Sequence, residues 1–169
     1  MPLSMYQASV PVFLRTLENL RSIVEKAARH AESRKFKPAA LLNARLYPDM
    51  FDLTQQIQIA TDFARGTAAR LAGTEPPAFD DKEQSFEDVL SRIDRTIAYV
   101  QTVRAGDIDG SEQREIVRPL RGEPHKFTGQ NYLFQFALPN FFFHATTAYA
   151  ILRHNGIEIG KGDFIGQVD

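Results

Sequence analysis

Two groups of residues have the clearest potential for chemistry: a histidine in an apolar segment, and polar side chains along a second segment. His144 follows a run of phenylalanines, so burial should strip water from its imidazole and leave its ring nitrogens in need of partners. From Pro48 onward, polar side chains lie beside an apolar stripe; they are Asp49, Asp52, Gln55, Gln56 and Asp62. If both segments are helices that face each other, His144 should meet Asp49, Asp52 or Gln56.

Three interpretations of such a contact stay open. It could be a metal site, an acid/base pair or a buried hydrogen bond, and the last is the usual state of a core histidine. Glutamine is a poor ligand for transition metals, which counts against the first. Thr147 shares a helical face with His144, and Tyr149 lies nearer its flank. The candidate pocket residues are therefore His144, Gln56, Asp52, Asp49, Thr147 and Tyr149, and His144 is the candidate ligand for a divalent metal.

The other histidines fit structural roles better than chemical ones. His154 lies ten residues after His144, which separates the two by roughly 15 Å along a helix, too far for one ion to bind both. It precedes Asn155-Gly156, where the dipole of a helix end favours a cation. We expect His30 and His125 to be exposed. No phosphate-binding glycine loop, HExxH or GxSxG motif is present.

Apolar residues recur at three- and four-residue steps in four segments and predict four helices. Their approximate ranges are 4–33, 48–71, 85–104 and 140–154. Pro11 favours a kink or a later start at Ser9. Pro48 suits a first helical position, with Asp49 and Asp52 in the first turn. The last helix is apolar on nearly all sides, so we expect it to be central and buried.

The connecting segments carry their own signals. Ser85 with Asp88 three residues on resembles a capping box. The side chains of residues 115–128 alternate as they do in strands, and an Arg-Gly-Glu-Pro turn divides the segment. This pattern predicts a small exposed hairpin. Pro139 should break the helical path after a short helix capped by Thr128. Residues 105–111 are expected to form a loop, and the apolar residues of 157–169 should pack back onto the helices.

Composition narrows the classes of function. The 169 residues include 20 basic and 21 acidic ones and no cysteine, so thiolate chemistry is excluded and neither charge dominates. We expect no nucleic-acid partner, because the basic set Arg114, Arg118, Arg121 and Lys126 is interspersed with glutamates. Residues 1–12 do not resemble a signal peptide, and the apolar run 132–144 is too short to span a bilayer. We therefore expect one cytoplasmic domain over residues 1–169 without membrane association.

Two strings of residues resemble the motifs of one family. The first is Tyr-Pro-Asp-Met-Phe at 47–51, leading into Gln-Gln-Ile at 55–57. The second is Pro-Asn-Phe-Phe-Phe-His at 139–144, followed by 148–156 with Ile-Leu-Arg-His-Asn-Gly. Both resemble domain-of-unknown-function family nineteen-ninety-three, within the DinB/YfiT-like superfamily, over nearly the whole chain.

The resemblance implies an all-α fold: an up-down-down-up four-helix bundle, often dimeric, here with a small hairpin or extended segment between helices three and four. Many superfamily members bind a divalent metal through a histidine of helix two and an HxxxH pair of helix four. This sequence departs from that pattern, because residues 48–71 contain no histidine, and alanines occupy the positions four after His144 and four before His154. The three-histidine site therefore cannot be carried over.

Two hypotheses of function follow. In the first, His144 and the polar groups of the second helix line an internal pocket for a small molecule or a divalent metal. In the second, the protein is a non-enzymatic, homodimeric structural or stress-related binding protein, with the aromatic residues around 132–143 forming an interface.

Overall fold

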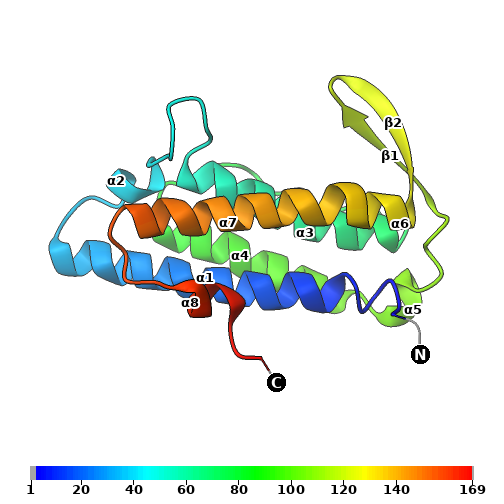
Figure 1. Cartoon of the computed structure of the whole chain (residues 1–169), viewed down its shortest axis with the longest axis horizontal. Coiled ribbons are helices and arrows are strands. Elements are labelled where there is room, and N and C mark those ends of the chain that lie inside the picture. The colour runs from blue at the N-terminus through cyan, green and yellow to red at the C-terminus, as the bar shows by residue number, and fades with distance from the viewer. Residues whose placement is uncertain (1–2, 169) are drawn as a thin grey trace.

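The computed structural model describes residues 3–168; the expected single domain therefore includes three residues, 1, 2 and 169, that lie outside the described part. The chain is mostly helical. Four helices of 17 or more residues run along the long axis of the molecule (Figure 1). They are α1 (Val10–Arg34), α3 (Leu53–Leu71), α4 (Phe86–Thr102) and α7 (Leu138–His154).

Helix α1 begins directly after Ser9, which agrees with the later of its two expected starts. Ser9 precedes its first residue, and Pro11 lies in the first turn, where a missing N–H costs no hydrogen bond. The helix ends at Arg34, and the following residue, Lys35, caps it in the left-handed conformation with φ of 56° and donates its N–H to the backbone oxygen of Glu32. The short helix α2 (Ala39–Leu42) follows in the linker.

The expected start of α3 at Pro48 is wrong. The helix begins at Leu53, and Asp52 is its N-cap: its carboxylate accepts a hydrogen bond of 2.9 Å from the backbone N–H of Gln55. A cap of this kind satisfies a backbone donor that the first turn leaves free. Asp49 lies in the preceding loop and is exposed, so neither aspartate belongs to the first turn.

Helix α4 begins with the expected capping box. Ser85 accepts from the N–H of Asp88 at 3.1 Å, and the Asp88 carboxylate accepts from the N–H of Ser85 at 3.0 Å. The helix ends at Thr102. Part of the expected loop after it is helical instead, because α5 (Ala105–Ile108) forms one turn whose Ile108 side chain is fully buried.

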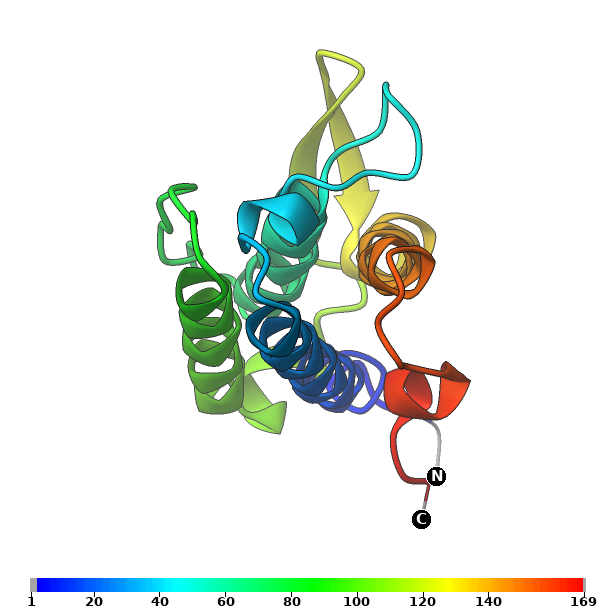
Figure 2. The same ribbon diagram turned by 90° about the vertical axis from the view of Figure 1, so that its left-hand side faces the viewer.

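The expected hairpin is present as the antiparallel strands β1 (Glu115–Leu120) and β2 (Glu123–Thr128). Its register pairs Glu115 with Thr128 and Pro119 with Pro124. The turn is shorter than the expected Arg-Gly-Glu-Pro, because Glu123 and Pro124 belong to β2. Arg121 and Gly122 form it with φ values of 54° and 88°, as two-residue turns between twisted strands require. The hairpin projects away from the helices (Figures 1 and 2).

Helical structure continues through Pro139, so the expected break there is wrong. The short α6 (Gly129–Asn131) is capped by Thr128 as expected and leads into the π-helix η1 (Tyr132–Ala137), which leads directly into α7. Pro139 lies in the first turn of α7 and breaks nothing, because this turn can accommodate a residue without an N–H.

The core is one contiguous apolar cluster in which α3 packs on α7 and α1 packs on α4. Ile157 and Ile159 are buried, and α8 (Lys161–Ile165) lies beside α1 (Figure 2), where Lys26 Nζ is 2.6 Å from Asp163 Oδ1. Helix α7 is less enclosed than expected: the Phe142 and Phe143 side chains are 37% and 56% exposed. No helix among residues 3–168 has the length and apolar character needed to cross a membrane.

Candidate functional site

His144 meets one of its three expected partners, Gln56. Helices α3 and α7 pack against each other and bring the two residues together although 88 positions separate them. The distance between His144 Nδ1 and Gln56 Oε1 is 2.7 Å. Both side chains are buried, with exposures of 8% and 1%. Asp49 and Asp52 make no hydrogen bond to His144.

The hydrogen bonds of Gln56 determine which imidazole nitrogen carries the proton. Gln56 Nε2 donates to the backbone oxygen of Phe51 at 3.1 Å, which leaves Oε1 as the acceptor facing the ring. His144 Nδ1 must therefore donate, and in the neutral imidazole Nε2 then carries the lone pair. Among residues 3–168, Nε2 has no hydrogen-bond partner.

Aromatic rings surround the imidazole. Phe63 of α3 lies nearly parallel to it, with ring centroids 6.3 Å apart, and Phe143 meets it edge-on at 5.2 Å. Burial among these rings lowers the pKa of His144 below its ordinary value, because a charged imidazole needs hydration and burial has removed that water. His144 is thus a neutral imidazole at neutral pH, with a basic nitrogen available to a donor or a cation.

The remaining pocket candidates do not join this contact. Asp52 caps α3 and lies 3.6 Å from Arg45. Thr147 donates to the backbone oxygen of Phe143 at 2.7 Å, and Tyr149 packs against Phe164 of α8. Of the six candidate residues, the structure joins His144 and Gln56 by a hydrogen bond, and whether the others belong to a site stays a prediction.

The residues around His144 do not fit the superfamily's metal centre. Gln56 Oε1 is already occupied by the imidazole N–H. Within residues 3–168 no group of three or more histidine, cysteine or acidic side chains lies close enough together to hold an ion. A single Nε2 ligand is too few for a stable divalent site, since structural and catalytic sites use three or four protein ligands.

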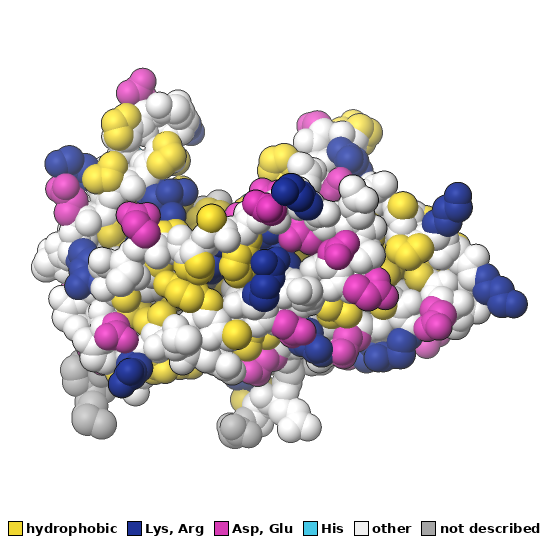
Figure 3. Space-filling model, turned by 180° about the vertical axis from the view of Figure 1, so that it is seen from behind, with side chains coloured by type: hydrophobic (Ala, Val, Ile, Leu, Met, Phe, Trp, Pro, Cys, Tyr) yellow, Lys and Arg dark blue, Asp and Glu magenta, His cyan; other side chains and the backbone are white. Residues whose placement is uncertain are grey.

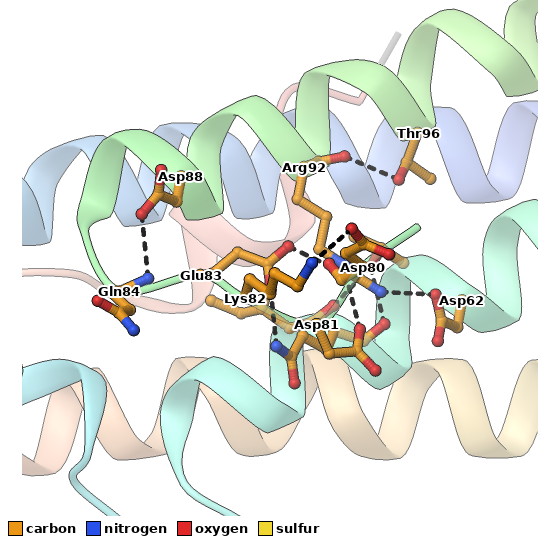
Figure 4. A network of polar contacts seen from close by, with 12 residues as sticks. Asp62, Asp80, Asp81, Lys82, Glu83, Gln84, Asp88, Arg92 and Thr96 are labelled. Carbon is orange, nitrogen blue, oxygen red and sulfur yellow. Dashed lines mark hydrogen bonds and ion pairs between the residues drawn. The ribbon is translucent and has the colours of Figure 1, made fainter. Parts of the chain in front are cut away.

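The main polar cluster that sequence analysis missed surrounds Arg92 of α4, whose side chain is fully buried (Figure 4). Its guanidinium donates to Thr61 at 2.8 Å, Asp62 at 2.7 Å and Glu83 at 3.0 Å. Asp81 lies 2.9 Å away. Burial alone would lower the pKa of Arg92, but its acidic partners outweigh it and raise the pKa. The cluster anchors the loop before α4 to α3.

No sequence pattern clearly indicates the cluster around Arg92. Arg92 interrupts an otherwise regular amphipathic helix, and Asp81 and Glu83 are ordinary loop residues. Nearby, Phe79 lies between the guanidinium carbons of Arg65 at 4.1 Å and Arg95 at 4.4 Å. On the face of the molecule seen in Figure 3, acidic and basic side chains are intermingled.

Comparison with known proteins gives a consistent result. The model of a family described as "Domain of unknown function (DUF1993)" matches residues 5–165. The crystal structure of a DinB family member protein from Shewanella denitrificans is similar, with a TM-score of 0.90 and 38% sequence identity. The alignment covers 96% of this chain and 92% of that one. No protein with a curated description matches the sequence.

Proposed function

The chain belongs to the DUF1993 family, and from that premise we propose that it is a DinB-like bundle protein that binds a small molecule at His144. The observation that carries the proposal is the free lone pair of His144 Nε2. A neutral imidazole held by Gln56 between two aromatic rings suits a ligand with an apolar ring and one hydrogen-bond donor.

The proposal includes the finer architecture of an up-down-down-up four-helix bundle. In support, the chain colour in Figure 1 runs one way along α1 and α7 and the other way along α3 and α4. The hairpin lies between the third and fourth long helices in the sequence. The cytoplasmic location expected from the sequence stays a prediction.

A phenol is the simplest probe of this site, because its ring can pack on Phe63 or Phe143 while its O–H donates to Nε2. We expect titration with phenol to shift the Nε2 resonance in a long-range proton–nitrogen NMR spectrum and to give saturable binding. His144→Asn keeps a donor near the position of Nδ1 and removes Nε2. It should weaken phenol binding by about tenfold, the usual effect of losing a buried hydrogen bond.

The control is Thr146→Ala, an exposed change on the same helix that should leave phenol binding unaltered. Phenol binding of equal strength to wild type and His144→Asn would overturn the proposal. Titration with Zn²⁺ in the same experiment tests the alternative ligand: saturable binding lost in His144→Asn would favour the metal over the small molecule.

The expected homodimer is a second candidate, favoured by aromatic side chains that the fold leaves exposed near His144. Phe143 adjoins the imidazole, and Phe51, whose backbone oxygen binds Gln56, is 50% exposed. Exposed aromatic side chains close together are typical of interfaces. A dimer through this face would close His144 off from solvent.

Light scattering coupled to size-exclusion chromatography measures the oligomeric state of the protein directly. If the aromatic face joins two copies, the mass should be near twice the 19.1 kDa of one chain, and Phe143→Ser with Phe51→Ser should reduce it to a single chain. Leu120→Ser, a similarly exposed apolar residue on the hairpin, serves as the control. A wild-type monomer at high concentration would exclude the dimer.

A further inference from the structure

A cavity of about 150 Å³ lies between α3, the loop after it, the hairpin and η1, and His144 is not part of its lining. Four charged side chains line it: Asp62, Arg65 and Arg70 of α3, and Arg118 of β1. The hydroxyl-bearing Tyr132, the first residue of the π-helix, completes the polar lining. The hairpin therefore contributes an arginine to a site whose other charges come from a long helix.

Positive charge exceeds negative charge in this cavity. Three guanidinium groups face one carboxylate, and the carboxylate of Asp62 already binds Arg65 at 2.6 Å and Arg92 at 2.7 Å. Arg70 and Arg118 have no acidic side chain within 4 Å in the described part of the chain. The lining thus carries two positive charges in excess.

Arg70 is held in place by two features of the structure. Its Nη1 donates to the hydroxyl oxygen of Tyr132 at 3.2 Å, and Thr67 Oγ1 lies 3.5 Å from the same hydroxyl. A Cβ at position 66 would overlap the same nitrogen, so Gly66 makes room for the guanidinium. Glycine inside a helix lowers stability, and close approach of another group is a physical reason for it.

Arg65 brings a donor that the protein leaves without a partner. Its guanidinium nitrogens Nη1 and Nη2 bind the backbone oxygen of Pro77 and the carboxylate of Asp62, but its buried Nε has no partner among residues 3–168. Unsatisfied buried donors are rare, and each calls for an acceptor.

The surroundings of Arg118 disfavour its positive charge. Its half-buried position and the charge of nearby Arg70 both lower the pKa of its guanidinium. Two like charges share the cavity without an acidic partner, so an anion between them would relieve their repulsion.

We propose that this cavity binds a phosphate group, either as inorganic phosphate or as the phosphomonoester of a small molecule. A phosphate at neutral pH carries a charge of about −1.5 to −2 and accepts several hydrogen bonds, which matches the excess charge of the lining and the guanidinium donors of Arg70 and Arg118. Arginine pairs with phosphate through two parallel N–H groups. By the same measure of cavity volume one water molecule needs roughly 10–15 Å³, so the cavity has room for one phosphate group.

The test is calorimetric titration of the full chain with inorganic phosphate, phenyl phosphate and acetate at low ionic strength. We expect saturable phosphate binding and weaker acetate binding, because acetate carries a single charge. Tighter binding of phenyl phosphate identifies an ester as the ligand, and equal affinity identifies inorganic phosphate. Arg118→Gln should weaken phosphate binding by about tenfold or more.

Gly66→Ala is the second variant, because alanine favours the helix and should leave the protein folded while it displaces Arg70. It should weaken phosphate binding as well. Arg121→Gln, on the same hairpin but outside the lining, is the charge-matched control and should bind normally. His144→Asn should also bind phosphate normally, so that this site and the one at His144 are tested separately. No phosphate binding to wild type, or an equal loss in Arg118→Gln and Arg121→Gln, would overturn the proposal.

Discussion

At the scale of single residues, His144 is a buried histidine whose two ring nitrogens have different surroundings. Its Nδ1 is satisfied by Gln56, its ring lies against Phe63 and Phe143, and its Nε2 has no hydrogen-bond partner in the described part of the chain. Enclosure keeps the imidazole neutral, and Gln56 fixes the proton on Nδ1. A nitrogen held in this state can accept a proton or a hydrogen bond at neutral pH without first losing one.

The lowered pKa of His144 predicts how stability changes with pH. Below the ordinary value of 6.5, the unfolded chain takes up a proton that the folded protein still excludes. The free energy of unfolding should therefore decrease as the pH falls from 6.5 towards the lower folded-state pKa of His144. Urea denaturation at a series of pH values should show this slope in wild type and a shallower one in His144→Asn. If the free energy of unfolding changed with pH in the same way in both proteins, His144 would not be the source of the slope.

At the scale of elements, Arg92 joins three parts of the chain through polar contacts. It extends from α4 to Thr61 and Asp62 on α3, and to Asp81 and Glu83 in the loop between the two helices (Figure 4). Because the same loop carries Phe79 and Pro77, which contact Arg65, the cluster also sets the position of one wall of the phosphate cavity.

Removal of the Arg92 charge should destabilise the protein strongly. Arg92→Met leaves the Glu83 carboxylate, which is 4% exposed, without its cation, whereas Asp62 keeps its ion pair with Arg65. We expect a loss of about 3 kcal/mol, at the lower end for a broken buried pair because Asp62 and Asp81 are partly exposed. Arg95→Met on the same helix loses only a cation–π contact and should cost no more than about 1 kcal/mol. Urea denaturation compares the two, and equal losses would show that Arg92 has no special role.

At the scale of the whole molecule, one core joins all the long helices. Residues from α1, α3, α4 and α7 belong to the same buried cluster, and the segment after α7 adds Ile157 and Ile159 to it. A cluster of this kind cannot lose one helix without exposing the faces of its neighbours, so local and global unfolding should be closely coupled.

Thermal or urea unfolding should accordingly be a single transition. Far-UV circular dichroism reports the helices, and tyrosine fluorescence reports the fully buried Tyr132 and four other tyrosines, because the chain contains no tryptophan. The two midpoints should coincide. A separate early transition in one signal would show that a part of the chain, such as the hairpin with η1, unfolds independently.

Local chemistry in the sequence was sufficient to predict several features. The capping box of Ser85 and Asp88, the turn at Arg121 and Gly122, and the start of α1 after Ser9 all involve groups within a few residues of each other. Hydrophobic periodicity likewise predicted the four long helices, because each must bury one face whatever its partner.

Features that depend on contacts between distant segments were decided only by the tertiary structure. His144 had three plausible partners on one helix, and the packing of α7 on α3 selected Gln56, while Asp52 was already committed to capping α3. The same holds for the burial of Arg92 and for the approach of Arg118 to Arg70. Sequence spacing determines which residues share a helical face, but the angle and offset at which two helices pack determine which side chains across the interface meet.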